Sequence, residues 1–346
     1  MIKPKKLQKG DTIAIVALSW GGHEYFPHIV EQGIKRLENE FGFKIKIGNT
    51  LNLTNKELYE NPKKRADDLH EQFLDKNVKG IIAIIGGSES IRVLPYLDMN
   101  LIKNNFKFFM GYSDIVTFNT YFNLNGLVTF NGPTVMAGFG ESKELEEDFV
   151  EYMNNFLFDN WGEFKYEKFK RYTNKYLDWS DIKNLEKENT NYINNNDNWH
   201  FISGNKKIEG ELFGGCIEVL EFMKATPFWP NKNFWNNKIL FFETSEEKPK
   251  ISNVESWLRN YGMQGILNKV NGIVFGRARD YSLDEKKELE NVILKILKEF
   301  KIENLNIITN VDFGHTDPQI ILPLGIKAEI NPKEKTFKLI ESIWED

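Results

Sequence analysis

Short apolar runs of strand length alternate with amphipathic segments of helical length over the first 160 residues. The runs that predict β-strands lie at 12–18, 44–48, 80–85, 107–110 and 127–130. The clearest helical pattern lies at 62–76. Ala66, Leu69 and Phe73 fall on one face of it. Strands that alternate with helices favour a parallel sheet covered on both faces, so the pattern predicts an α/β fold, whose ligands bind beyond the carboxyl ends of the strands.

The segment at 161–206 differs in character from its flanks. It is polar, rich in Asn and without sustained periodicity, which predicts a long excursion or linker. Strand and helix patterns resume after it. Three short strands end the chain, around 319–323, 326–330 and 336–341. We therefore expect an N-terminal α/β domain over 1–160, the polar excursion over 161–206, and a smaller β-rich mixed α/β domain over 207–346.

Composition narrows the class of function. The 346 residues carry a net charge of −5, which gives no electrostatic footprint for nucleic acid. The single cysteine, Cys216, excludes an internal disulfide and a zinc site built from cysteines. The first apolar run is too short for a signal peptide or a membrane span. A cytoplasmic protein without nucleic-acid or membrane partners is expected.

The stretch "FKFFMGYSDIVTFNTYF", residues 106–122, places Ser113 between an apolar strand and a helix. Such a corner lifts a hydroxyl above the sheet at the positive end of a helix, which is how a nucleophilic serine is presented. Serine is also a favoured N-cap, and the stretch alone leaves both interpretations open. A nucleophile would need a base, an orienting acid and an oxyanion site elsewhere in the chain.

A glycine turn follows another predicted strand, at Gly86-Gly87. Backbone N–H groups exposed there would form a nest for an anion, with Ser88 close by. The turn is therefore a phosphate cradle, an oxyanion hole or a plain tight turn. Neither the dinucleotide fingerprint nor the P-loop pattern is present, which weakens the phosphate interpretation.

Among five histidines, His315 stands out as a candidate base. It follows the predicted strand near 306–309 in a loop punctuated by Gly and Pro, with Asp312 and Asp317 close by. The Asp-x-x-His-x-Asp grouping leaves a metal site as an alternative, although no further ligands stand out and carboxylates also cap turns.

Glu243 is the leading candidate for an acid that orients His315. It ends the apolar run "KILFFE", where a carboxylate is costly unless it faces water or a partner. Glu246 and Glu247 follow it and are interpreted as ordinary solvated charges.

Eight short motifs occur in the order typical of one family. They are "LQKGDTIAIV", "RADDLHEQF", the "GG" turn with "LPYLD", "GYSD", "FNGP", "GELFGG", "LFFE" and "FGHTDPQIILPLG". On these motifs the chain resembles, over nearly its whole length, the serine peptidase family of LD-carboxypeptidases and microcin C immunity proteins.

The resemblance implies the roles of several residues. Ser113 would be the nucleophile, and Glu243 and His315 would complete the triad. The backbone N–H groups of the "GG" turn (Gly86, Gly87) and of Asp114 would form the oxyanion hole. It also implies a flavodoxin-like parallel-sheet domain and a β-rich second domain with the triad at their interface, a homodimer, and no cofactor or metal.

Two departures from the family pattern fall near the expected site. Leu18-Ser19-Trp20 replaces the usual Pro-Ser after the first strand, and Val116 replaces the usual Thr after "SDI". Neither touches the expected triad, but both would alter the pocket.

Two branches of activity follow from the resemblance. One is cleavage of the amide in aminoacyl- or peptidyl-nucleotide analogues, as in microcin immunity and antibiotic resistance, and the long excursion favours it. The other is LD-carboxypeptidase trimming of the terminal D-Ala of muropeptides. A nucleotide-binding module without catalysis is a further alternative, which a complete set of Ser, Glu and His disfavours.

The excursion supplies candidate substrate contacts. We expect it to be mobile when empty and to close over the substrate, with Trp179, or as second choice Trp199, stacking on a base. Anchoring of the excursion to the body of the protein is the alternative role for both tryptophans.

Overall fold

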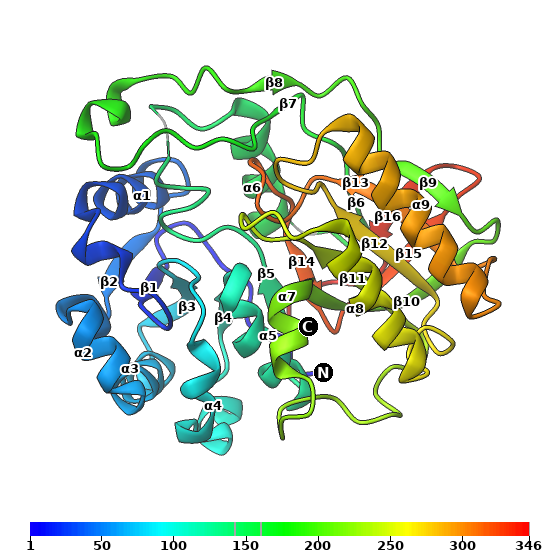
Figure 1. Ribbon diagram of the computed structural model, residues 1–346. Helices are drawn as coiled ribbons and strands as arrows, with labels where there is room; N and C mark the ends of the chain where they lie inside the picture. Colours follow the sequence, from blue (N-terminus) through cyan, green and yellow to red (C-terminus); the bar gives the residue numbers. More distant parts are fainter. Residues whose placement is uncertain (142, 160, 346) are drawn as a thin grey trace.

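The computed structural model describes residues 1–141, 143–159 and 161–345, in which two β-sheets carry the fold (Figure 1). The first sheet has the order β14-β5-β4-β3-β1-β2. Its strands are β1 (Thr12–Val16), β2 (Lys44–Ile47), β3 (Val78–Ala83), β4 (Phe108–Met110), β5 (Thr129–Asn131) and β14 (Leu322–Leu324). All neighbours pair in parallel except β14, which is antiparallel to β5.

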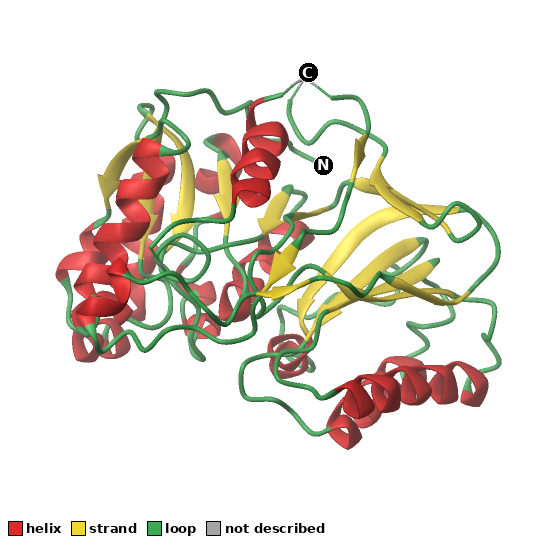
Figure 2. Cartoon of the chain, turned by 90° about the horizontal axis from the view of Figure 1, so that it is seen from above, coloured by secondary structure: helices red, strands yellow, loops and turns green. Residues whose placement is uncertain are grey.

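Helices cover both faces of the first sheet (Figure 2). They are α1 (Pro27–Asn39), α2 (Asn55–Glu60), α3 (Pro62–Leu74), α4 (Met99–Asn104), α5 (Val116–Leu124) and α6 (Glu147–Phe158). Ile13 and Ile15 of β1 join the core that contains α1, whereas Ala14 and Val16 join the core that contains α3. Successive side chains of a strand point to opposite faces, so β1 is buried on both sides. This confirms the predicted parallel α/β fold, and α3 confirms the helix expected at 62–76.

The second sheet is mixed, as expected from the sequence, with the order β6-β16-β15-β10-β11-β12-β13-β9. Its central strands are parallel: β10 (Ile208–Cys216), β11 (Lys238–Glu243), β12 (Gly272–Gly276) and β13 (Asn306–Val311). Antiparallel strands flank them: β15 (Lys327–Asn331), β16 (Thr336–Leu339), β6 (Phe164–Lys165) and β9 (His200–Ser203). Helices α7 (Ile217–Met223), α8 (Ile251–Met263) and α9 (Leu283–Glu299) complete this half of the molecule.

The strand expected around 319–323 lies in a different sheet from the one predicted. The sequence pattern groups it with the last strands of the second domain, but β14 pairs with β5 of the first sheet, with Leu322 opposite Asn131. Because β14 runs antiparallel to β5, the loop that precedes it emerges at the carboxyl ends of the parallel strands. That loop contains His315.

The polar excursion has structure of its own. Its two ends supply β6 and β9, which form opposite edges of the second sheet, and between them β7 (Arg171–Tyr172) pairs with β8 (Ile193–Asn194). Figure 1 shows the segment, in green, running along one side of the molecule toward α1. Its 3₁₀ helix at Ile182–Glu186 contacts α1, so the excursion spans both halves of the protein.

A buried charge anchors the excursion. Asp312 is fully buried at the end of β13, and its carboxylate pairs with Nη2 of Arg277 at 2.7 Å. It also accepts hydrogen bonds from Nε1 of Trp199 at 2.7 Å and from Nδ2 of Asn195 at 3.2 Å. The Arg277 guanidinium stacks on the ring of Tyr172, 3.8 Å from its centroid. Three residues of the excursion thus contact one buried ion pair.

None of the helices in the described ranges is both long enough and apolar enough to cross a membrane.

Replacing Arg277 by Met tests the anchor. The change leaves the Asp312 carboxylate buried without a cation, so we expect a loss of about 3–5 kcal/mol in the free energy of unfolding. Urea denaturation followed by circular dichroism measures this loss, and faster proteolytic cleavage within 161–206 should accompany it. Arg259→Met is the matched control, because Arg259 pairs with Glu255 and Glu299 at the surface and should cost at most about 1 kcal/mol. Equal losses in the two variants would contradict the anchor.

Candidate active site

Ser113 sits on a strained corner between β4 and α5. Its φ of 59° lies in the left-handed region, which is uncommon for a residue with a side chain. A single 3₁₀ turn, Ser113–Ile115, leads from the corner into α5. The cap of that turn is Tyr112, and no side-chain hydrogen bond caps it. The N-cap interpretation of Ser113 is therefore wrong, and the strained strand-to-helix corner is what the structure contains.

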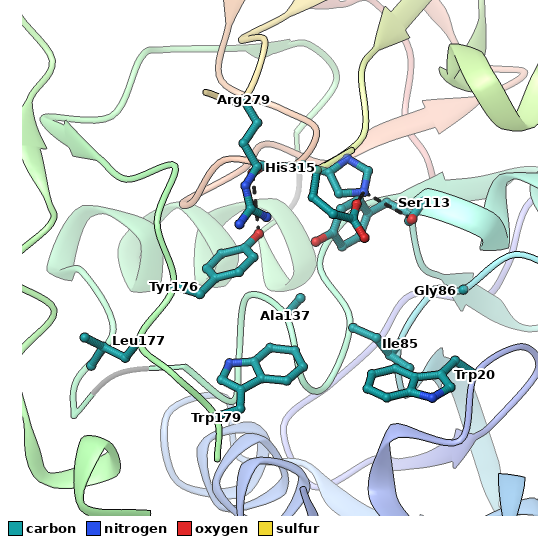
Figure 3. Close-up of a pocket in the computed structure, with 13 residues that line it drawn as sticks. Trp20, Ile85, Gly86, Ser113, Ala137, Tyr176, Leu177, Trp179, Arg279 and His315 are labelled. Atoms are coloured by element: carbon teal, nitrogen blue, oxygen red, sulfur yellow. Dashed lines mark hydrogen bonds and ion pairs between the residues drawn. The ribbon is translucent and has the colours of Figure 1, made fainter. Parts of the chain in front are cut away.

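Two distant residues meet Ser113 at this corner (Figure 3). Nε2 of His315 lies 3.1 Å from Oγ of Ser113, and Nδ1 of His315 lies 2.7 Å from Oε2 of Glu243. Both His315 and Glu243 are buried. When Nδ1 carries the proton and donates it to Glu243, the lone pair of Nε2 faces the Ser113 hydroxyl. This is the arrangement in which an imidazole can accept a proton from serine.

Glu243 ends β11, and the loop that carries His315 closes over it. Gly314 has a φ of 101°, and a Cβ added there would lie 2.7 Å from the Cβ of Glu243. Only glycine lets this loop approach the carboxylate so closely. The close approach of Gly314 to Glu243 therefore positions Glu243 and His315 together. Ser113 reaches them from the other sheet.

Glu246 differs from its prediction as an ordinary solvated charge. Its Oε2 lies 2.9 Å from Nε2 of His315, although the side chain is 51% exposed. The hydrogen bond with His315 lowers the pKa of Glu246 to about 2. Burial opposes the charged imidazole, but Glu243 and Glu246 outweigh it and raise the pKa of His315 to about 10. Both carboxylates therefore favour the protonated form of the imidazole.

The glycine turn lies against the serine. A Cβ added at Gly86 would be 2.7 Å from the Cβ of Ser113 and 3.2 Å from the backbone nitrogen of Asp114. Within the described part of the chain, the N–H groups of Gly87 and Asp114 donate no hydrogen bond. The turn therefore leaves backbone donors next to Ser113, as an oxyanion hole requires.

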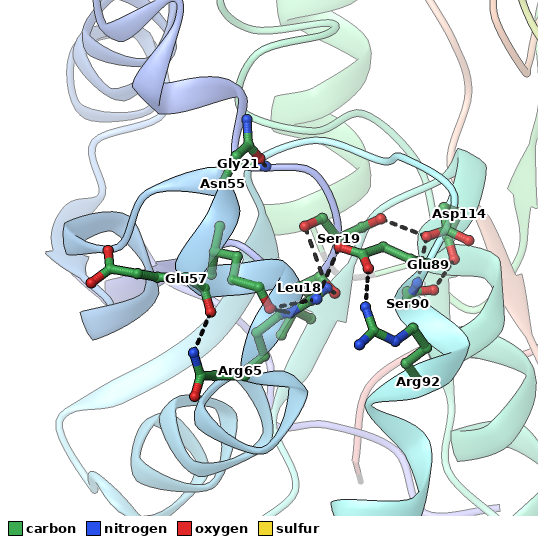
Figure 4. A network of polar contacts seen from close by, with 12 residues as sticks. Leu18, Ser19, Gly21, Asn55, Glu57, Arg65, Glu89, Ser90, Arg92 and Asp114 are labelled. Atoms are coloured by element: carbon green, nitrogen blue, oxygen red, sulfur yellow. Dashed lines mark hydrogen bonds and ion pairs between the residues drawn. The ribbon is translucent and has the colours of Figure 1, made fainter.

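Buried polar contacts hold the turn and the corner together (Figure 4). Oδ2 of Asp114 accepts a hydrogen bond from Oγ of Ser19 at 2.6 Å and from the N–H of Ser90 at 2.8 Å. The Ser90 hydroxyl donates in turn to the Asp114 carbonyl at 2.8 Å. Behind them, the fully buried Arg65 pairs with Glu89 at 2.9 Å. Ser19 comes from the motif that departs from the family pattern, and sequence reasoning assigned no role to it or to Ser90.

A cavity of about 290 Å³ opens in front of Ser113. Its wall is formed largely by loops that follow strands of the two sheets and by the excursion: Trp20, Ile85, Tyr112, Ala137, Tyr176, Leu177, Trp179, Glu246 and Arg279. Of the three proposed substrate contacts only Trp179 lines it. Ser88 is exposed beside the turn, and Trp199 is the anchor bound to Asp312, so neither lies on this wall.

Trp179 reaches the cavity because the excursion docks on the first domain. Nε2 of His28 lies 2.8 Å from the carbonyl oxygen of Trp179, and the Phe26 ring contacts the indole edge to face at 5.6 Å. Neither Trp20 nor Arg279 is among the substrate contacts proposed from the sequence. The sequence offered a signal for Trp20, because the "LSW" departure from the family pattern follows a predicted strand. For Arg279, the only signal was that its loop follows a strand, β12.

The Asp312–His315–Asp317 grouping does not assemble as a ligand set. Asp312 is turned to Arg277 and Trp199, and the nitrogens of His315 face Glu243, Ser113 and Glu246. The described residues contain no cluster of three or more His, Cys, Asp or Glu side chains suited to a metal ion.

Known proteins of similar sequence and structure span the whole chain. A probable murein peptide carboxypeptidase of Bacillus subtilis is 30% identical over 96% of this chain and 93% of its own length. The microcin C7 self-immunity protein MccF of Escherichia coli is 26% identical over 97% of this chain and 94% of its own. The structure of MccF in complex with aspartyl sulfamoyl adenosine superposes with a TM-score of 0.88 at 25% identity and covers 100% of both chains.

Both halves of the chain also match family models. Residues 13–132 match the LD-carboxypeptidase N-terminal domain, and residues 209–330 match the LD-carboxypeptidase C-terminal domain. The two matched segments contain Ser113 in the first and Glu243 and His315 in the second. The chain therefore belongs to the S66 family of peptidases, which it shares with LD-carboxypeptidases and MccF.

Proposed function

We propose that the protein is a serine peptidase or amidase in which Ser113 attacks the carbonyl carbon of an amide. His315 takes the hydroxyl proton at Nε2 and later gives it to the departing nitrogen, and Glu243 holds the imidazole through Nδ1. The observation that carries the proposal is the unbroken series of contacts, 3.1 Å and then 2.7 Å, that starts on a strained serine. Water then releases the acyl group from Ser113 with His315 as base.

The developing oxyanion would be bound by backbone donors. The N–H groups of Gly86, Gly87 and Asp114 are the candidates, because the turn packs against Ser113 and Asp114 follows it. Donors of this kind act most strongly where water is excluded and where they need no rearrangement. The bonds from Ser19 and Ser90 to Asp114 supply that rigidity.

For the substrate we propose an aminoacyl- or peptidyl-nucleotide analogue. The cavity offers two indoles, Trp20 and Trp179, and an exposed aromatic face binds a nucleobase by stacking. MccF, whose fold this chain shares, has been captured with aspartyl sulfamoyl adenosine. Cleavage of such a compound would detoxify it, as expected of an immunity protein.

Muropeptide trimming is the second candidate. Arg279 lines the cavity, and a guanidinium can bind the carboxylate that a terminal D-Ala presents. The carboxypeptidase relative of Bacillus subtilis supports this branch.

Removing the Ser113 hydroxyl should abolish turnover. Ser113→Ala and His315→Ala should each reduce kcat by on the order of 10⁴–10⁶, and the double variant should lose no more than either single one, since the residues act as a unit. Release of amino acid or peptide from a sulfamoyl adenosine or a D-alanyl peptide measures this. Ser256→Ala, on the exposed side of α8, is the control and should keep full activity. Wild-type activity in Ser113→Ala would refute the mechanism.

Gly86→Ala tests the oxyanion hole. The new methyl would press on Ser113 and displace the turn, so kcat should fall by about 10²–10³, the loss seen when one oxyanion donor is removed. Gly162→Ala is a matched control, because a Cβ there meets nothing within 4 Å. An active Gly86→Ala protein with an unchanged melting temperature would place the oxyanion donors elsewhere.

Trp179→Ala tests the nucleotide branch. Loss of one stacking partner should weaken kcat/KM for aminoacyl sulfamoyl adenosines by about tenfold to a hundredfold and hardly change it for small D-alanyl peptides. Trp199→Ala should instead affect both substrate classes alike, since this residue anchors the excursion. A loss in Trp179→Ala that is equal for both classes would make Trp179 structural as well.

A further inference from the structure

One nitrogen of His315 has two partners that it cannot serve at the same time. Nε2 lies 3.1 Å from Oγ of Ser113 and 2.9 Å from Oε2 of Glu246. A neutral imidazole with its proton on Nδ1 presents a lone pair at Nε2, which accepts from the hydroxyl and repels the carboxylate. The contact with Glu246 is favourable only when Nε2 carries a proton. In that state His315 cannot act as a base.

Glu246 is placed where a ligand can reach it. It follows Glu243 by three residues on the loop after β11, but it lines the cavity and is 51% exposed, whereas Glu243 is fully buried. Among the described residues, His315 is the partner with which Glu246 forms an ion pair. An incoming cation would therefore compete with the imidazolium for this carboxylate.

Among the described residues on the cavity wall, Glu246 is the one carboxylate, so a cation is the ligand that would bind there. Among the described residues, Arg279 is the one arginine or lysine on the wall, and its guanidinium stacks on Tyr176 at 4.3 Å. The buried carboxyls of Asp317 and Glu141 lie near it: burial raises the pKa of both, and the charge of Arg279 opposes this rise. A third carboxylate, Asp280, lies 3.6 Å from Nε of Arg279, so the guanidinium has a partner of its own, whereas Glu246 faces the cavity.

We propose that Glu246 is a specificity residue that selects substrates with a cationic acyl residue. An ammonium or guanidinium beside the scissile amide takes over the Glu246 carboxylate, the Nε2 proton of His315 passes to water, and the lone pair left on Nε2 faces Ser113. The inference rests on the proposed roles of Ser113 and His315. It assigns to this site a preference opposite in charge to the acidic acyl group of the aspartyl sulfamoyl adenosine bound to MccF.

Three acyl residues separate charge from size. Lysyl and norleucyl groups have similar chains and differ by the ammonium, and an aspartyl group reverses the charge. Each acyl group is supplied both as an acyl sulfamoyl adenosine and as an acyl-D-alanine peptide, so that cleavage can be measured with either leaving group. We expect wild-type kcat/KM to be at least tenfold higher for lysyl than for norleucyl, with aspartyl lowest.

Glu246→Gln should remove that preference. The kcat/KM of the lysyl substrate should fall about tenfold, mainly through KM, and that of the norleucyl substrate should rise, because Nε2 is no longer held by a carboxylate.

The pH profile gives a second readout. The groups that face His315 are Glu243, Glu246, Asp317, Tyr112 and Arg279. Since Glu246 raises the pKa of His315, its removal should move the acidic limb of the kcat/KM profile for norleucyl substrates to lower pH. Glu247→Gln, at an exposed neighbour off the cavity wall, is the matched control and should change neither quantity.

Binding separates this inference from the proposed function. Calorimetric titration of Ser113→Ala, with and without Glu246→Gln, with the lysyl and norleucyl sulfamoyl adenosines needs no turnover. A lysyl preference that Glu246→Gln abolishes supports the inference, even if the mechanism assigned to Ser113 fails. An equal affinity for both ligands in Ser113→Ala, or an unchanged preference and pH profile in Glu246→Gln, would overturn it.

Discussion

The antiparallel pairing of β14 with β5 sets where the second half of the chain meets the first. It joins the segment that follows His315 to the sheet whose β4 leads to Ser113, and contacts of α5 with α7 and β10 add to this junction. Because β14 runs against β5, the loop before β14 is delivered to the carboxyl ends of β3 and β4. Ser113 and His315, 202 residues apart in sequence, then approach to 3.1 Å. The buried pairing of β14 with β5 thus helps to set the distance between the Ser113 and His315 side chains.

The corner at Ser113 is stable because its surroundings leave it no alternative. A left-handed serine carries a conformational cost, and such residues persist where neighbouring contacts over-determine them. Here Gly86 packs on one side, and Asp114 is tied to Ser19 and Ser90 on the other. The same contacts that hold the strained backbone also orient the N–H groups that we assign to the oxyanion hole. Strain and pre-organisation therefore have one structural cause.

Electrostatics in the cavity depend on more than the residues assigned to catalysis. Glu243 is buried behind His315, and a second carboxylate, Glu246, approaches the same ring from the solvent side. Two anions on one imidazole favour its charged form, which suits a resting site and opposes the first proton transfer. Occupation of the cavity must shift that balance, and the charge of the substrate is a direct means of doing so. The excursion contributes another part of the wall, since its anchor at Asp312 and its docking at His28 bring Trp179 to the side of the cavity that also holds Trp20.

The sequence alone determined the features that depend on residues close together in the chain. The alternation of strands and helices, the corner at Ser113, the glycine turn and the carboxylate that ends β11 are all local patterns. Family resemblance added the grouping of Ser113, Glu243 and His315, which the structure brings together. Tertiary structure decided the placement of β14, the anchoring role of Trp199, and the pairing of the half-exposed Glu246 with His315. Each of these features depends on contacts between segments far apart in the chain. The energy of such a contact is set by burial and by the partner group. The hydrophobic period of a strand or helix, two or 3.6 residues, indicates neither the burial nor the partner.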